Sequence, residues 1–186
     1  MRNNLYTLLF LIVGLCPWNA ATLHAADVDL QPGMKAPTFT LPSQDGTPVN
    51  LADYHGKWVV VYFYPKDKST GCTIQAHAYQ DHLPQFEAKN AVVLGVSLDT
   101  AESHKSFCTQ DGLTFKLLAD PDHKVVDAYG VPVKTFTDPK TNTPVTIAMR
   151  QTFLIDPSGK IVKTWDVKDI PNHSADVLAA IAAGGK

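Results

Sequence analysis

The chain has 186 residues, of which 45% are hydrophobic and 18% charged, and its formal net charge is −2. This length and composition indicate one globular domain, without a long low-complexity segment or an internal repeat. Because no stripe of Lys and Arg is present to release counterions from phosphates, nucleic acid is excluded as a partner.

The first 26 residues carry the pattern of a secretory signal peptide. A short positive start (residues 1–4) precedes an apolar stretch (5–18) and the small-residue exit "TLHAA". We expect cleavage after Ala25 or Ala26, which leaves residues 27–186 as an exported domain with no membrane attachment, in a bacterium most simply in the periplasm. A membrane anchor is the alternative, but the apolar stretch is shorter than the ~20 residues that a spanning helix needs.

Cleavage would remove Cys16 and leave two cysteines, Cys72 and Cys108, in the exported domain. In an oxidising compartment such a pair can form a permanent structural disulfide or take part in redox chemistry. The pair alone leaves both interpretations open, and the surroundings of Cys72 have to decide.

In chain order, the segment "FTLPSQDGTPVNL" (39–51) predicts a β-hairpin around a Gln-Asp-Gly turn. The uniformly apolar "WVVVYFY" (58–64) predicts a strand buried on both faces, and apolar residues at helical spacing predict a helix from Thr73 to about Lys89. A second buried strand, "AVVLGVS" (91–97), is followed by a helix over 101–110, capped by Thr100 and closed by Gly112.

The second half of the chain continues the alternation. "HKVVDAYG" (123–130) predicts a short helix with a glycine stop, and "QTFLID" (151–156) and "KIVKTWD" (160–166) predict two strands around a tight turn. Ser174 opens a final helix through Ala183. We therefore expect an α/β domain with a central sheet covered on both faces, and its parallel strands place the loop after residue 64 at a carboxyl edge, where small molecules bind.

Cys72 leaves that loop at the start of a helix, where free N–H groups and a partial positive charge favour a thiolate. Lowering a thiol pKa from ~8.5 to ~6 raises its ionised fraction at pH 7 about thirtyfold. The lower pKa also makes the thiolate about thirteenfold less nucleophilic, so the net gain is small. Fast chemistry would therefore need further groups that bind the transition state, each worth ~3 kcal/mol when it is preorganised.

Two segments resemble the peroxiredoxins. "PKDKSTGC" (65–72) fits their signature of a proline, three residues, Thr or Ser, two residues and the peroxidatic cysteine, and "MRQTFLIDPSGKI" (149–161) resembles the segment that carries their catalytic arginine. The wider pattern is similar to the bacterioferritin comigratory protein, or Q-type, branch over nearly the whole mature chain. This resemblance implies a thioredoxin-like fold with a central mixed β-sheet flanked by helices and an N-terminal β-hairpin.

The resemblance also implies the site. Cys72 would attack a peroxide oxygen, Ser69 would hydrogen-bond the peroxide, Arg150 would stabilise the thiolate and the transition state, and Pro65 would shield the sulfenate. The implied enzyme is a thiol-dependent peroxidase for hydrogen peroxide and organic hydroperoxides, with a thioredoxin-like reductant, no cofactor, no metal and a monomeric state.

Three positions depart from the pattern. Ser69 stands where many members have threonine, and Thr70 stands where proline is common. His77 replaces the nearby resolving cysteine of many members, so resolution would fall to Cys108, which lies 36 residues after Cys72 (108 − 72). By resemblance to another Q-type subgroup, Cys72 and Cys108 would form the redox disulfide.

Other interpretations remain at this point. Arg150 could be an ordinary surface charge, Cys108 a small buried hydrophobe, and His77 a polar residue on a helix face. A thiol-disulfide reductase on the same fold would need Cys-x-x-Cys, which is absent after Cys72. An exported copper-binding module could use Cys72, His77 and Cys108, which are suitable copper ligands.

Overall fold

The computed structural model describes residues 28–139 and 141–185, so the expected signal peptide lies outside the described residues. Among the described residues, no helix is long and apolar enough to cross a membrane.

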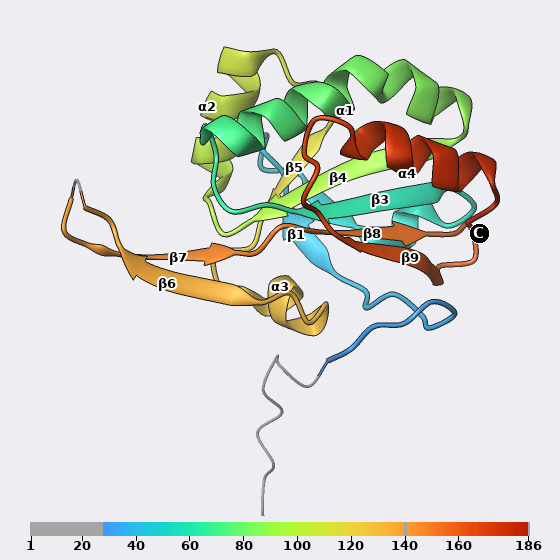
Figure 1. Cartoon of the computed structure of the whole chain (residues 1–186), viewed down its shortest axis with the longest axis horizontal. Coiled ribbons are helices and arrows are strands. Elements are labelled where there is room, and N and C mark those ends of the chain that lie inside the picture. The colour runs from blue at the N-terminus through green and yellow to red at the C-terminus, as the bar shows by residue number, and fades with distance from the viewer. Residues whose placement is uncertain (1–27, 140, 186) are drawn as a thin grey trace, which may run out of the picture.

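A five-stranded mixed sheet forms the centre of the molecule (Figure 1). Its strand order is β5-β4-β3-β8-β9, with β3, β4 and β5 parallel and with β8 antiparallel to β3 and β9. The strands are β3 (Trp58–Phe63), β4 (Ala91–Ser97), β5 (Lys116–Ala119), β8 (Gln151–Ile155) and β9 (Ile161–Asp166). The expected α/β architecture with a central mixed sheet is confirmed.

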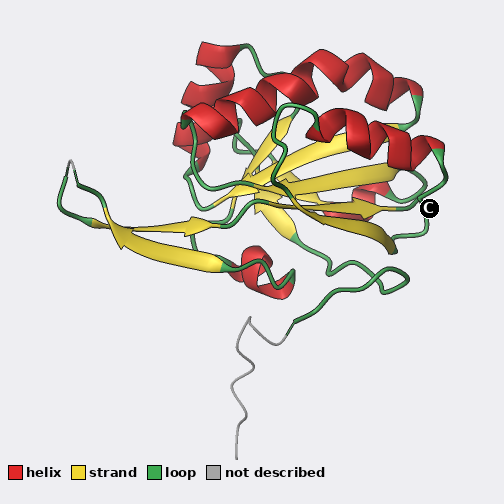
Figure 2. Ribbon diagram, in the orientation of Figure 1, coloured by secondary structure: helices red, strands yellow, loops and turns green. Residues whose placement is uncertain are grey.

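Three helices cover one face of this sheet, as Figure 2 shows. They are α1 (Thr70–Ala88), α2 (Ala101–Asp111) and α4 (His173–Ala182). Val60 and Tyr62 of β3 point into the core beneath them, where they join apolar residues from all three helices, among them Phe86, Phe107 and Val177.

The opposite face packs against shorter elements: the hairpin of β1 (Thr40–Pro42) and β2 (Pro48–Asn50), the 3₁₀ helix η2 (Leu51–Tyr54) and α3 (Lys124–Ala128). Val59, Val61 and Phe63 of β3 enter this second core, which also holds Phe39 and Tyr129. Because alternate residues of β3 enter the two cores, the strand is buried on both faces. This confirms the burial predicted for β3, and the N-terminal hairpin is confirmed as well.

A glycine in β4 makes room for a tyrosine beneath α1. A Cβ atom added to Gly95 would lie 2.7 Å from Cζ of Tyr62 and 2.6 Å from Cδ2 of Leu117, closer than packed carbon atoms approach. The Tyr62 ring lies in this space and stacks on Tyr79 of α1, with ring centroids 4.7 Å apart. This contact holds the first half of α1 against the sheet.

Several elements differ from the prediction. The predicted elements do not include β5 or a second hairpin, β6 (Val133–Thr137) and β7 (Pro144–Ala148), which projects from the body of the molecule in Figure 1. Helix α1 begins three residues earlier than predicted, at Thr70, and α4 begins one residue earlier, at His173.

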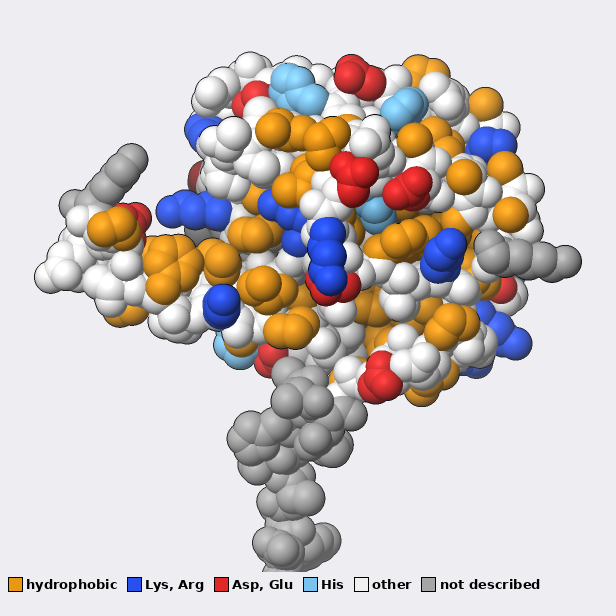
Figure 3. All heavy atoms as spheres, in the orientation of Figure 1, with side chains coloured by type: hydrophobic (Ala, Val, Ile, Leu, Met, Phe, Trp, Pro, Cys, Tyr) orange, Lys and Arg blue, Asp and Glu red, His pale blue; other side chains and the backbone are white. Residues whose placement is uncertain are grey.

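On the face seen in Figure 3, acidic and basic side chains are interspersed, in keeping with the small net charge.

Candidate active site

The sheet brings two distant segments of the chain to one edge. β3 ends at Phe63, and the loop after it leads into α1, which carries Cys72. β8 runs antiparallel to β3 and starts at Gln151, which pairs with Phe63. Arg150, immediately before β8, therefore reaches the carboxyl edge of β3, and its carbonyl accepts a 3.2 Å hydrogen bond from the N–H of Val167.

The first turn of α1 carries the cysteine. Ser69 is the N-cap residue in an extended conformation, and the first backbone bond of the helix joins the N–H of Thr73 to the carbonyl of Ser69 at 2.9 Å. Cys72 is thus the third residue of the helix, inside the turn rather than ahead of it as the predicted start at Thr73 implied. The amide groups of this turn precede the first helical bond and point toward the loop, where they favour negative charge.

Arg150 lies directly against the cysteine. Its Nη2 atom donates to the sulfur of Cys72 over 3.2 Å, and Nη1 donates to the side-chain oxygen of Gln75. Cys72 is only 2% exposed and Gln75 only 1%. Arg150 itself is half-buried. Since a guanidinium keeps its proton, the enclosed sulfur faces a fixed positive charge.

Gln75 is a site residue that sequence reasoning missed. It lies three residues after Cys72 in α1, so both side chains lie on the same face of the helix. The available signal was this spacing, but a glutamine at that distance is common on any helix. Its bond to Arg150 holds the guanidinium fork in place beside the sulfur.

The two other predicted residues lie in the loop that precedes α1. The Ser69 hydroxyl donates to the carbonyl of Lys66 over 3.0 Å, so its proton is used within the loop while its oxygen can still accept. Pro65 is partly buried and lies two residues after the end of β3. The structure therefore places Pro65, Ser69, Cys72 and Arg150 at one edge of the sheet.

Cys108 lies in the last turn of α2, on the same side of the sheet as Cys72, and contributes to the same core. Both sulfurs are free thiols. Burial raises the pKa of the Cys108 thiol to about 11, and the charges of Asp67 and Asp111 add to this effect. In this state Cys108 is a protonated and unreactive thiol.

His77 lies on the exposed side of α1, where its Nε2 atom is 3.1 Å from a carboxylate oxygen of Asp111 at the end of α2. In the part of the chain that the structure describes, no three His, Cys, Asp or Glu side chains are grouped closely enough to hold a metal ion. The three ligands considered for copper, Cys72, His77 and Cys108, do not form a site in this arrangement.

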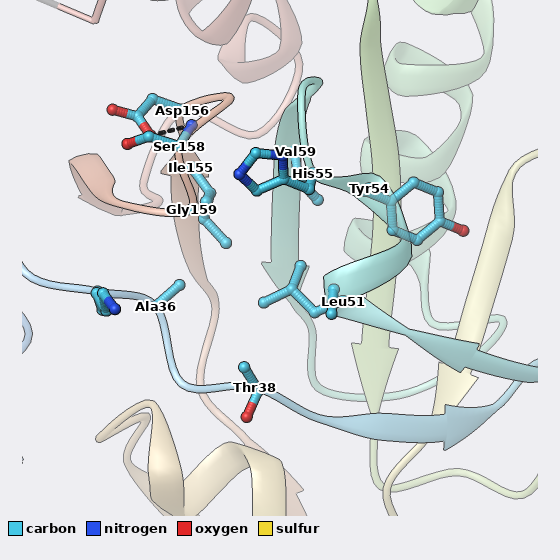
Figure 4. Close-up of a pocket in the computed structure, with 12 residues that line it drawn as sticks. Ala36, Thr38, Leu51, Tyr54, His55, Val59, Ile155, Asp156, Ser158 and Gly159 are labelled. Carbon is cyan, nitrogen blue, oxygen red and sulfur yellow. Dashed lines mark hydrogen bonds between the residues drawn. The ribbon is translucent and has the colours of Figure 1, made fainter.

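A cavity of about 210 Å³ lies away from the cysteines (Figure 4). Its lining includes Val59 at the start of β3, Ile155 at the end of β8 and His55 between η2 and β3. It is therefore at the opposite edge of the sheet from Cys72, and none of the predicted site residues lines it.

The fold and the site define a class of enzyme: a thioredoxin-like domain in which a buried cysteine at a helix N-terminus contacts an arginine. The family model described as the AhpC/TSA family matches residues 32–164. Peroxiredoxin Bcp of Escherichia coli (strain K12) is 40% identical over 149 residues, which cover 80% of this chain and 94% of that protein.

Solved structures agree with this match. The structure of PrxQ from Xylella fastidiosa aligns with a TM-score of 0.75 at 36% identity, and covers 86% of this chain and 99% of its own. The bacterioferritin comigratory protein of Xanthomonas campestris aligns with a TM-score of 0.70 at 36% identity, over 80% of this chain and 92% of its own. The chain belongs to the AhpC/TSA family, and it is a peroxiredoxin of the Bcp, or Q, type, a thiol peroxidase that acts through a peroxidatic cysteine.

Proposed function

We propose that Cys72 is the peroxidatic cysteine and that Arg150, Ser69 and Pro65 serve it at the carboxyl edge of the sheet. The observation that carries this assignment is the 3.2 Å contact between Nη2 of Arg150 and the sulfur of Cys72. The thiolate attacks the terminal oxygen of a hydroperoxide, the O–O bond breaks, and an alkoxide or hydroxide leaves. Cys72 becomes a sulfenic acid in this step.

Each neighbour has a distinct role in this displacement. Arg150 stabilises the negative charge that passes from sulfur to the leaving oxygen, which is transition-state stabilisation by a preorganised donor. The Ser69 oxygen accepts a hydrogen bond from the peroxide, since its own proton is donated to Lys66. Pro65 limits the access of water to the sulfenic acid.

The proposed substrates are hydrogen peroxide and organic hydroperoxides. The Xanthomonas campestris protein is described for its alkyl peroxide reduction activity. Exposed apolar side chains flank the two site segments of this chain, with Ile74 two residues after Cys72 and Met149 immediately before Arg150.

We assign the resolving role to Cys108. Two solved variants of Xanthomonas campestris peroxiredoxin Q each have serine in place of one of two cysteines, and those cysteines lie 36 positions apart. Cys72 and Cys108 have the same separation (108 − 72 = 36). Condensation of the Cys108 thiol with the sulfenic acid forms a disulfide and releases water. A disulfide needs Cα atoms within ~7 Å, so we expect the end of α2 or the start of α1 to unwind locally.

Replacing Cys108 with serine should separate the two half-reactions. The Cys108→Ser variant is expected to react with the first equivalent of peroxide at the normal rate, because Cys72 and Arg150 are intact. It should then lose recycling by thioredoxin and accumulate sulfinic acid at Cys72 with excess peroxide. Intact-protein mass spectrometry after increasing peroxide measures this gain of two oxygen atoms. Recycling by thioredoxin at an unchanged rate would contradict the assignment.

The proposed reductant is a thioredoxin-like protein, which attacks the disulfide through a mixed disulfide. The function is tested with metal-free mature protein, thioredoxin, thioredoxin reductase and NADPH, in which added hydroperoxide should drive steady NADPH oxidation. A copper-binding module would give no turnover under these conditions. We propose that the working unit is a monomer.

The proposed location is the periplasm, after removal of residues 1–26. The mass of the mature protein from a bacterial host should correspond to a chain that starts near Ala26 or Asp27. A full-length chain that begins at Met1 and remains in the membrane fraction would instead support an anchor.

A further inference from the structure

A buried carboxylate–imidazole pair links the segments that carry the two cysteines. Asp67 belongs to the loop between β3 and α1, five residues before Cys72, and His104 belongs to α2, four residues before Cys108. The His104 Nδ1 atom lies 2.9 Å from one carboxylate oxygen of Asp67 and 3.1 Å from the other. His104 is fully buried and Asp67 is 7% exposed. Neither residue takes part in the peroxide step proposed above.

The bonds around Asp67 determine which nitrogen of His104 holds a proton. Burial raises the pKa of Asp67, but the hydrogen bond and charge of His104, with the hydroxyls of Ser103 and Tyr64, outweigh burial and keep that pKa below its ordinary value. Asp67 is therefore an ionised acceptor. In the neutral form of His104, the Nδ1 atom carries the proton that Asp67 accepts, which leaves a lone pair on Nε2.

That lone pair is unused. The Nε2 atom of His104 is buried and has no hydrogen-bond partner among residues 28–139 and 141–185. Buried nitrogens are nearly always paired, so an orphaned one needs an explanation. His104 and Cys108 are four residues apart on one helix face, where Cβ atoms lie ~5–6 Å apart.

The resolving step needs a base at this place. While the end of α2 is folded, burial, with the charges of Asp67 and Asp111, raises the pKa of Cys108 to about 11, so Cys108 enters the resolving step as a thiol. The thiol, not the thiolate, would otherwise meet the sulfenic acid, and it is a weak nucleophile.

We propose that His104, oriented by Asp67, is the general base of the resolving step. As the Cys108 sulfur attacks the Cys72 sulfur, Nε2 accepts the thiol proton. The S–O bond then breaks, and the same proton passes to the departing hydroxide, which leaves as water. The inference rests on the proposed resolving role of Cys108.

The anchoring of His104 suits this role. Asp67 holds the imidazole to the loop that precedes Cys72, and the backbone N–H of Asp67 in turn donates to Asp99 over 2.8 Å. His104 therefore stays beside the loop that precedes Cys72. The end of α2 that carries Cys108 moves toward this loop. Cys108 as nucleophile, His104 as base and Asp67 as orienting carboxylate form the arrangement that commonly activates a nucleophile in enzymes.

The other charged or titratable groups around His104 and Cys108 come from three parts of the fold and could also affect the pH profile of disulfide formation. They are Tyr62 and Tyr64 at the end of β3, Asp99 and Asp111 at the two ends of α2, and Lys116 of β5.

The test measures the two half-reactions separately after one equivalent of hydrogen peroxide, as formation and loss of the Cys72 sulfenic acid. His104→Asn preserves a donor to Asp67 but has no base. We expect normal sulfenic acid formation and about 100-fold slower disulfide formation at pH 7, with a rate that rises tenfold per pH unit as long as the Cys108 thiol is mostly protonated. In the unmodified protein the same rate should not show this tenfold rise per unit above pH 8, because a base already accepts the thiol proton.

The control is His123→Asn, since His123 forms a similar pair with Asp127, 2.7 Å apart, on the other side of the sheet. It should leave both half-reactions unchanged. Asp67→Asn should slow only disulfide formation, by about tenfold, because the imidazole loses its orienting charge.

Three results would overturn the inference. The first two concern His104→Asn: a normal rate and pH profile of disulfide formation, or an equal loss of rate in both half-reactions. The third is an unmodified protein in which the rate of disulfide formation still rises tenfold per pH unit above pH 8. The last measurement needs no variant and remains decisive if His104→Asn does not fold. Failure of the proposed function is distinguishable, because a Cys108→Ser variant would then lose its sulfenic acid and recycle normally.

Discussion

Replacing Cys72 with serine should abolish peroxide turnover. A serine hydroxyl is a far weaker nucleophile than a thiolate, and it cannot form a sulfenic acid or a disulfide. The fold should survive, because serine has nearly the same size and the surrounding core of α1 and β3 is unchanged. The measurement is hydroperoxide consumption by the metal-free variant with thioredoxin, thioredoxin reductase and NADPH.

The matched control is Cys108→Ser, which makes the same chemical change in the neighbouring helix and should still consume one equivalent of peroxide. Circular dichroism and the thermal midpoint of both variants show whether the fold is intact. Peroxide consumption by a folded Cys72→Ser variant at a rate near that of the unmodified protein would contradict a peroxidase mechanism that acts through Cys72.

The second large effect is expected at Arg150. The Arg150→Ala variant should consume peroxide about 100-fold more slowly or worse, because it loses a preorganised donor worth ~3 kcal/mol in the transition state. Loss of the Nη2 contact over 3.2 Å also leaves the buried Cys72 sulfur without its positive neighbour. Stopped-flow measurement of the second-order rate constant with hydrogen peroxide tests this directly.

Arg150→Lys is the useful comparison, since it preserves the charge but cannot reach both Cys72 and Gln75 with one planar fork. Its rate should lie between those of the alanine variant and the unmodified protein. If Arg150→Ala lowers the unfolding free energy but not the rate constant, the arginine has a structural role only.

The buried strands and their order of appearance could be predicted because their residues are apolar without interruption. β3 and β4 enter two cores, so nearly every side chain is hydrophobic and no other element fits that pattern. Cys72 could be identified because a short motif fixes its spacing from Pro65 and Ser69. Arg150 depended on a second motif, and the antiparallel pairing of β8 with β3 then explains its place at the site.

Other features depend on contacts that no local pattern reveals. β5 has only four residues and owes its place to pairing with β4. In the β6–β7 hairpin, every residue of β6 is exposed and only the last residue of β7, Ala148, is fully buried, so the hairpin has no well-buried face. Helix α1 starts at Thr70 because Ser69 is extended, although residues 70 and 71 are not helix formers.

The hydrogen bonds of Asp67 and Gln75 near the site could not be predicted either, because they join segments that are far apart in the sequence. The partner of Asp67 is His104, 37 positions away, and the partner of Gln75 is Arg150, 75 positions away. Sequence spacing within one helix can place two residues on a face, but only the packed sheet shows which residue of another segment meets them.

The central claim is that Cys72 and Cys108 form one disulfide within a single chain during turnover. It is tested most directly by peptide mapping of the reduced mature protein after one equivalent of hydrogen peroxide, without reductant and with free thiols blocked. We expect a crosslinked peptide pair containing Cys72 and Cys108 in a protein of monomer mass, which thioredoxin converts back to two thiols. A disulfide-linked dimer, or a Cys72 sulfenic acid with a free Cys108 thiol and full thioredoxin-dependent turnover, would contradict it.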